Sequence, residues 1–186
     1  GNYIFHEDGT VTFLDFGCVK RFAPERVSVM STVVDAALAF DALGVLQAFI
    51  DVGLLADADA EGLDPDRLLE YYRAALRDRW DTQPFTYTPE SVAKIVSGTY
   101  QPVGPYYDIT RQLQMPKDLL FLNRITVGAS SVLGHLYATA DWKSVDCEIR
   151  HDGPPATELG RLEASWRSDR NLTGAQPLGP AEGIVA

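Results

Sequence analysis

Cysteine and histidine are scarce in this chain of 186 residues. It contains two cysteines, Cys18 and Cys147, and three histidines, His6, His135 and His151. The cysteines are too few and too far apart to form a disulfide framework or a zinc site. The histidines show no spacing that is typical of metal ligands. These absences argue against a disulfide-stapled scaffold and a zinc protein, and they are compatible with a reducing cytoplasm, where we expect the protein to be located.

Basic residues are also in short supply, and long hydrophobic runs are missing. Sixteen Lys and Arg face twenty-six Asp and Glu, which gives a net charge of −10. A nucleic-acid binder needs a basic face to neutralise phosphates, so we expect no nucleic-acid partner. The longest uncharged stretch, 125–140, is shorter than a bilayer requires, and no transmembrane helix is predicted. An acidic protein that handles ATP would depend on Mg²⁺ to mask the phosphate charge.

The residues that are present predict an α+β fold that is predominantly helical. Hydrophobic residues make up 46% of the chain, enough for one well-packed domain. Tyr3 to His6 and Thr10 to Leu14 are rich in β-branched and aromatic residues, and the Asp8-Gly9 pair between them is a strong hairpin signal. We therefore expect a β-hairpin over residues 3–14, followed by a helical bundle.

Helix start and stop signals recur after the hairpin. Proline near a first helical position, acidic caps and a terminal glycine predict helices from Pro24, over 41–52, from Pro65 to Trp80, and over 89–98. These signals place most of the chain after the hairpin in helices.

The longest expected helix runs over 116–138 and is apolar on most sides. That composition predicts a position in the interior of the bundle, with Arg124 buried against a carboxylate. The composition shifts after residue 150. We expect one domain over 1–150 and a C-terminal tail over 151–186, with a helix at 157–169 followed by a disordered Gly/Pro/Ala-rich end.

The first seventeen residues carry the clearest functional signal. Asn2 precedes the hairpin and Asp15 follows it, thirteen residues later. Folding the hairpin back brings its two open ends together, so we expect the two side chains to lie side by side. Mg²⁺ prefers oxygen ligands, and nucleotide enzymes often supply only one or two from the protein. The pattern predicts that Asn2 and Asp15 are ligands of one magnesium site.

With these residues in view, the chain resembles the UbiB/AarF family of atypical protein-kinase-like proteins. The catalytic loop of that family usually reads His-x-Asp-Pro-His-Pro-Gly-Asn, and Gly1-Asn2 matches its last two letters. Asp15-Phe16-Gly17 matches the metal-binding triplet of kinases. The segments CVKRF, DVGLL and LLFLNRITVGASSVLGHLY are also similar, and the likeness covers roughly residues 1 to 145.

The resemblance implies a protein-kinase-like C-lobe that binds ATP and Mg²⁺. Asn2 and Asp15 would bind metal, Asp15 towards the β- and γ-phosphates, while Phe16 and Gly17 would complete the nucleotide-binding turn. The catalytic Asp, the nucleotide-covering loop and the Lys-x-Gly-Gln segment would lie before Gly1. The intact protein would then be an atypical kinase or ATPase, and the present chain alone would be inactive. No catalytic residue is expected within it.

The resemblance leaves the substrate open among proteins, lipids and small molecules. Members of the family are associated with isoprenoid-quinone (ubiquinone) biosynthesis or lipid homeostasis, which implies a peripheral membrane association. Two alternatives stay open. One is a small-molecule kinase of the aminoglycoside-phosphotransferase type, against which Phe16-Gly17 argues. The other is a non-catalytic helical scaffold or pseudokinase, which a non-acidic residue five positions before Asn2 would favour.

Overall fold

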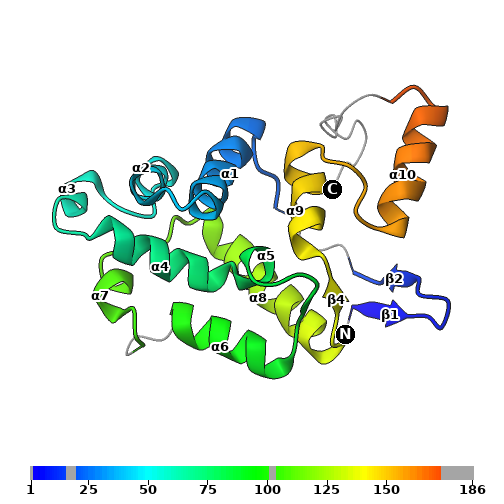
Figure 1. Ribbon diagram of the computed structural model, residues 1–186, viewed down its shortest axis with the longest axis horizontal. Coiled ribbons are helices and arrows are strands. Elements are labelled where there is room, and N and C mark those ends of the chain that lie inside the picture. The colour runs from blue at the N-terminus through cyan, green and yellow to red at the C-terminus, as the bar shows by residue number, and fades with distance from the viewer. Residues whose placement is uncertain (1, 16–19, 101–103, 173–186) are drawn as a thin grey trace.

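The computed structural model describes residues 2–15, 20–100 and 104–172. The described chain is mostly helical and carries a small N-terminal hairpin, as the sequence predicts (Figure 1). Its elements are β1 (Tyr3–Phe5), β2 (Val11–Phe13), α1 (Pro24–Leu38), α2 (Ala42–Val52), α3 (Asp57–Ala60), α4 (Pro65–Ala75), α5 (Arg77–Trp80), β3 (Phe85–Thr86), α6 (Pro89–Tyr100), α7 (Tyr107–Thr110), α8 (Leu119–His135), β4 (Thr139–Ala140), α9 (Trp142–His151) and α10 (Glu158–Asp169).

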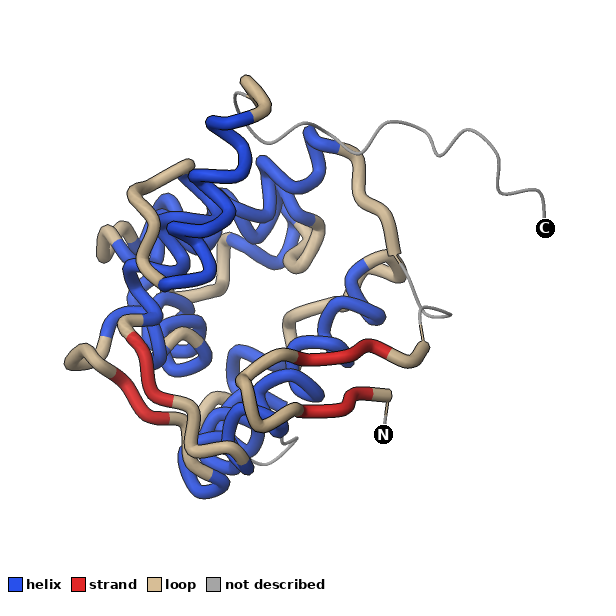
Figure 2. The backbone as a smooth tube through the Cα atoms, turned by 90° about the vertical axis from the view of Figure 1, so that its right-hand side faces the viewer, coloured by secondary structure: helices blue, strands red, loops and turns tan. Residues whose placement is uncertain are grey.

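The strands form two separate antiparallel pairs, β1 with β2 and β3 with β4 (Figure 2). The β1–β2 hairpin lies at one end of the molecule, and α3 and α7 lie at the other (Figure 1). Most of the helices are gathered between these ends. The hairpin that carries the predicted site is therefore an appendage of the bundle, and its residues from Asn2 to Asp15 are exposed.

The hydrophobic core is built mainly by α1, α2 and α4, with one residue each from α7 and α8 and three from connecting segments. Phe49 of α2 is its largest fully buried side chain, and its ring meets that of Tyr72 edge to face at 5.3 Å. The buried core residues are Val33, Ala37, Val45, Ala48, Phe49, Val52, Leu55, Leu63, Leu68, Leu69, Tyr71, Leu76, Ile109 and Leu119. Burial of these side chains holds the three helices together.

Local capping chemistry explains where the helices begin and end. The Asp41 carboxylate accepts a hydrogen bond from the Gly44 amide at 2.9 Å, and Gly53 closes α2 with a φ of +83°. Asp64 caps α4 in the same way, ahead of Pro65. Thr157 caps α10 through the Gly160 amide, which confirms the helix expected at 157–169. The end of the tail, 173–186, lies outside the described residues.

Helix α8 does not lie in the interior, so the expected burial is wrong. Leu120 is 55% exposed and Ile125 47% exposed, and Arg124 is also exposed rather than buried. The helix packs by one face against α6, where Gly134 approaches Val92 so closely that an added Cβ would lie 3.0 Å from it. A long helix beside a small bundle can bury only one face, whatever its composition. Along the part of the chain that is described, no helix combines the length and apolarity needed to cross a membrane.

Two further differences come from contacts between distant residues. The helix expected from Pro65 to Trp80 is broken at Leu76, whose φ of −103° and ψ of 21° separate α4 from α5. The β3–β4 pair and α9 were not predicted at all. Trp142, the first residue of α9, donates from its indole to the Phe85 carbonyl at 2.9 Å, which fixes α9 against β3.

Tyr87 should make the fold sensitive to alkaline pH. The side chain is 6% exposed and packs edge to face on Phe85 and Trp142. Burial, reinforced by the Asp78 carboxylate, raises the pKa of the phenol above its ordinary value. A raised folded-state pKa stabilises the fold below the unfolded pKa, near 10, and this contribution is lost as the pH rises further.

We expect the free energy of unfolding, measured in urea, to fall more between about pH 8 and about pH 11 in the wild type than in Tyr87→Phe. The loss in the wild type should exceed the loss in Tyr87→Phe by about 1 kcal/mol. This is the free energy that corresponds to about one pH unit, the interval between the unfolded pKa of tyrosine and about pH 11. Other groups titrate alike in both proteins and cancel. Equal losses would show that Tyr87 ionises as freely in the folded chain as in the unfolded one.

Candidate metal centre

The register of the hairpin brings its two ends together. Tyr3 pairs with Phe13, Ile4 with Thr12, and Phe5 with Val11. The Leu14 amide then donates to the Asn2 carbonyl at 2.9 Å, which continues the pairing to the open end. Asp15 follows one residue later, beyond the strand. The Asn2 amide nitrogen lies 3.5 Å from an oxygen of the Asp15 carboxylate, so the two side chains meet as expected.

The turn at the other end of the hairpin is set by Asp8 and Gly9. The Asp8 carboxylate accepts hydrogen bonds from the Thr10 amide at 2.9 Å and the Thr10 hydroxyl at 2.7 Å, and these bonds lower the pKa of Asp8. Gly9 has a φ of +82°, a conformation that glycine adopts without strain. This turn fixes the register and so determines which residues meet at the open end.

The two faces of the hairpin differ in chemistry. Tyr3 and Phe13 pack edge to face at 5.3 Å on one face, beside Phe5. On the other face the His6 ring and the Thr12 hydroxyl share a hydrogen bond of 2.8 Å. All of these side chains are exposed. The hairpin is therefore held by its own ladder and cross-strand pairs rather than by the helical core.

The donor set at the open end fits a magnesium ion. Turning the Asn2 amide over would exchange its nitrogen for its oxygen, so that Asn2 and Asp15 would offer two oxygen atoms about as far apart as the present contact. Neighbouring ligands of octahedral Mg²⁺ lie roughly 3 Å apart, close to that spacing. Both side chains are exposed, which leaves room for water and phosphate oxygens. Phe16 and Gly17, the other two predicted residues, lie outside the described residues.

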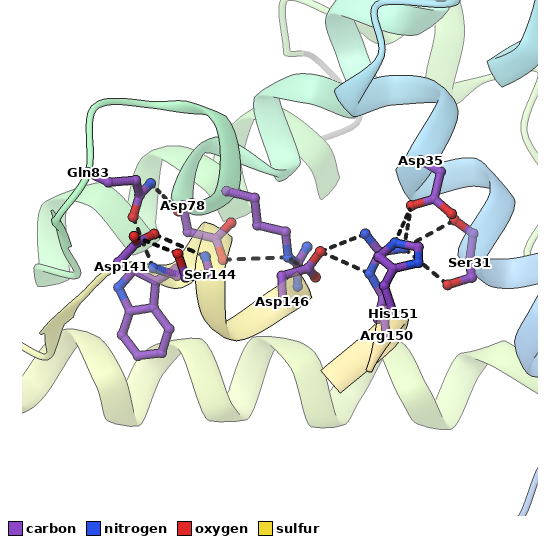
Figure 3. A network of polar contacts seen from close by, with 11 residues as sticks. Ser31, Asp35, Asp78, Gln83, Asp141, Ser144, Asp146, Arg150 and His151 are labelled. Atoms are coloured by element: carbon purple, nitrogen blue, oxygen red, sulfur yellow. Dashed lines mark hydrogen bonds and ion pairs between the residues drawn. The ribbon is translucent and has the colours of Figure 1, made fainter. Parts of the chain in front are cut away.

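Elsewhere in the described chain, several carboxylates make structural contacts. No three His, Cys, Asp or Glu side chains gather into a potential metal cluster within the residues that the structure describes. Figure 3 shows instead a polar network that joins α1, α5 and α9. Asp146 accepts from Arg79 at 2.9 Å and from Arg150 at 2.6 Å, and Arg150 also reaches Asp35 at 2.7 Å. The His151 ring lies 3.0 Å from the same Asp35 carboxylate.

This network was not predicted from the sequence. Its charges alternate in sign, so each carboxylate is neutralised by a neighbouring guanidinium. The spacing of Asp146 and Arg150, four residues apart, is the one local signal that could have indicated part of it. The contacts of Asp146 with Arg79 and of Asp35 with Arg150 and His151 join residues more than sixty positions apart, which no local pattern encodes. We interpret the network as structural.

Comparison of the chain with protein-family models, with curated proteins and with solved structures found no match. The functional argument therefore depends on the geometry of the hairpin and on the motif residues themselves.

Proposed function

We propose that this chain is the magnesium- and nucleotide-binding part of a phosphoryl-transfer enzyme, an atypical kinase or ATPase of the UbiB/AarF type, with a kinase-like C-lobe fold. The observation that carries the proposal is the contact between Asn2 and Asp15 across the open end of the hairpin. Protein kinases place an Asn and the Asp of an Asp-Phe-Gly triplet at their metal sites. In this chain the same residue types meet across the open end of the β1–β2 hairpin.

The roles of the residues follow from their chemistry. A bound Mg²⁺ would offset negative charge on the β- and γ-phosphates of ATP. Asp15 would contribute a carboxylate oxygen and Asn2 its neutral amide oxygen to the same ion. The hairpin ladder holds both residues at one end and limits the entropy lost when they bind. The net charge of −10 makes metal masking of the phosphates more important for nucleotide binding.

The remaining parts of such an enzyme would come from outside this chain. Transfer needs a catalytic base and a lobe that covers the nucleotide, so we propose that the chain binds Mg-nucleotide but does not turn it over alone. A lipid or isoprenoid-quinone connection, with peripheral contact to a membrane, is the extension that the resemblance supports. The protein would then act in the cytoplasm or at the membrane surface.

Binding of Mn²⁺ with ADP tests the metal site in the chain itself. Mn²⁺ replaces Mg²⁺ at oxygen sites and broadens the NMR signals of nearby nuclei. We expect substoichiometric Mn²⁺ with ADP to broaden the amide signals of Asn2 and Asp15 before others. In Asp15→Ala the broadening should require about tenfold more metal, because the charged ligand is lost.

Asp8→Asn is the matched control for this experiment. Asp8 lies in the same hairpin, and an Asn side chain can still accept the hydrogen bonds from Thr10. This variant should behave as the wild type. Preferential broadening around the acidic segment 57–61, with no effect at the hairpin, would instead show diffuse attraction of cations and would contradict the proposal.

A further inference from the structure

A pocket with aromatic walls lies against α4 and α5 and shares no residue with the hairpin. Its volume is about 460 Å³, within the range of small-molecule sites. The walls include Phe40, Trp80 and Tyr106, and Arg73 and Arg77 also line it. The pocket therefore combines flat apolar surfaces with cationic groups, which are the components of a site for an anion with an aromatic body.

Arg73 is the unusual member of this pocket. The residue is 7% exposed, and its guanidinium carbon lies 3.5 Å from the centre of the Phe40 ring and 4.5 Å from that of the Trp80 ring. One nitrogen donates to the Ala37 carbonyl at 2.7 Å. Within the described ranges no carboxylate lies at ion-pair distance from Arg73. Burial lowers the pKa of the guanidinium, although Arg stays charged at neutral pH.

The other charges around the pocket are already neutralised. Arg77 pairs with Asp81 at 2.8 Å, and Glu70 pairs with Arg67 at 2.8 Å. The pocket thus carries one uncompensated positive charge, which belongs to Arg73. A buried charge without a counter-ion is costly, and a guanidinium has five N–H donors to satisfy. Both facts favour an anionic partner from solution.

The aromatic walls are held in place before any ligand binds. The Trp80 indole donates to the Arg73 carbonyl at 2.6 Å, which fixes the ring beside α4. Phe40 has a φ of +59°, a strained conformation for a residue with a side chain, yet the residue is 67% exposed. The strained backbone and the exposed side chain of Phe40 both cost free energy. The contact of its ring with the Arg73 guanidinium offsets this cost. The site is therefore largely pre-formed.

We propose that this pocket binds a small aromatic carboxylate, with the carboxylate on the Arg73 guanidinium and the ring against Phe40 and Trp80. A guanidinium edge matches a carboxylate in a two-bond arrangement. One uncompensated positive charge suits a monoanion better than the dianion of a phosphate monoester. The site goes beyond the proposed nucleotide chemistry and is independent of it.

Calorimetric titration of the chain with three probes tests the proposal. The probes are 2-naphthoate, the uncharged 2-naphthamide, and phenyl phosphate. We expect 2-naphthoate to bind at least about tenfold more tightly than 2-naphthamide, because only the acid pairs with Arg73. Phenyl phosphate should bind more weakly than 2-naphthoate. Equal affinities for acid and amide, tighter binding of phenyl phosphate, or no binding of 2-naphthoate would each overturn the proposal.

Variants then locate the binding. Arg73→Gln should reduce the affinity for 2-naphthoate about tenfold, and Phe40→Gly should reduce it at least threefold. Phe40→Gly is the safer variant for folding, because Phe40 is exposed and glycine adopts its φ freely. Arg170→Gln is the matched control, since Arg170 also lies 4.5 Å from an indole, that of Trp166, and is not part of the pocket.

The control variant should bind 2-naphthoate as the wild type does. Circular dichroism establishes that each variant is folded before its affinity is compared. An affinity unchanged in folded Phe40→Gly, or reduced equally in Arg170→Gln, would place the ligand elsewhere and overturn the assignment.

Discussion

Asp15→Asn is expected to abolish Mg-nucleotide turnover by the proposed phosphoryl-transfer enzyme, with a loss of roughly a thousandfold or more. The substitution keeps the size of the side chain and removes its charge. A metal that neutralises phosphate charge contributes several kcal/mol to catalysis, and each 1.36 kcal/mol is a factor of ten in rate. Asp15 is exposed at the end of a hairpin outside the hydrophobic core, so the loss should not come from unfolding. The loss of turnover is measured as the rate of ADP release or of phosphotransfer at saturating Mg-ATP.

Asp8→Asn provides the comparison within the same hairpin. It removes one negative charge at the turn, at the far end of the hairpin from Asn2. We expect turnover within about twofold of the wild type, since surface substitutions of this kind seldom matter. Normal turnover by Asp15→Asn would refute the assigned role of Asp15. Equal losses in both variants would point to the net charge of the hairpin rather than to a metal ligand.

The parts of the fold that depend on neighbouring residues could be predicted from the sequence. The hairpin follows from two β-rich runs around Asp8-Gly9, and the caps at Asp41, Asp64 and Thr157 follow from short polar side chains before helical segments. Each of these features is determined within a few residues. The same reasoning brought Asn2 and Asp15 together, because a hairpin joins its ends by geometry alone.

The parts that depend on distant residues could not be predicted. The β3–β4 pair joins Thr86 to Thr139, which are far apart in the sequence. The helix break at Leu76 has no proline or glycine that would have predicted it. The exposure of α8 shows that an apolar composition alone does not predict burial, because an apolar helix can lie at the edge of a bundle. Arg73 was likewise inconspicuous in the sequence, since Phe40, the ring closest to its guanidinium, comes from a distant segment between α1 and α2.

Asp146→Ala should destabilise the protein by about 3 kcal/mol, the largest stability effect that we expect from a single charged residue. Its side chain is 11% exposed and neutralises both Arg79 and Arg150. Removing one partner of a buried ion pair leaves uncompensated charge in a poorly hydrated place, which costs more than the pair itself contributes. Here Arg79 would lose its closest carboxylate and keep only that of Asp78 at 3.9 Å. Arg150 would keep only the Asp35 carboxylate, and α9 would lose its ion pair with α5. Urea unfolding at neutral pH measures the change as a lower midpoint at an unchanged slope.

Glu163→Ala is the matched control, because Glu163 and Arg167 form the same carboxylate-to-arginine pair four residues apart, at 2.8 Å. That pair is exposed, with 54% of the Glu163 side chain accessible, so its loss should cost less than about 0.5 kcal/mol. Comparing the two variants thus separates the effect of burial on stability from the effect of the ion pair. If both lowered the unfolding midpoint by the same small amount, the network in Figure 3 would be a set of independent surface contacts. A large loss confined to Asp146→Ala would establish that the Asp146 carboxylate, through Arg79, holds α9 against α5.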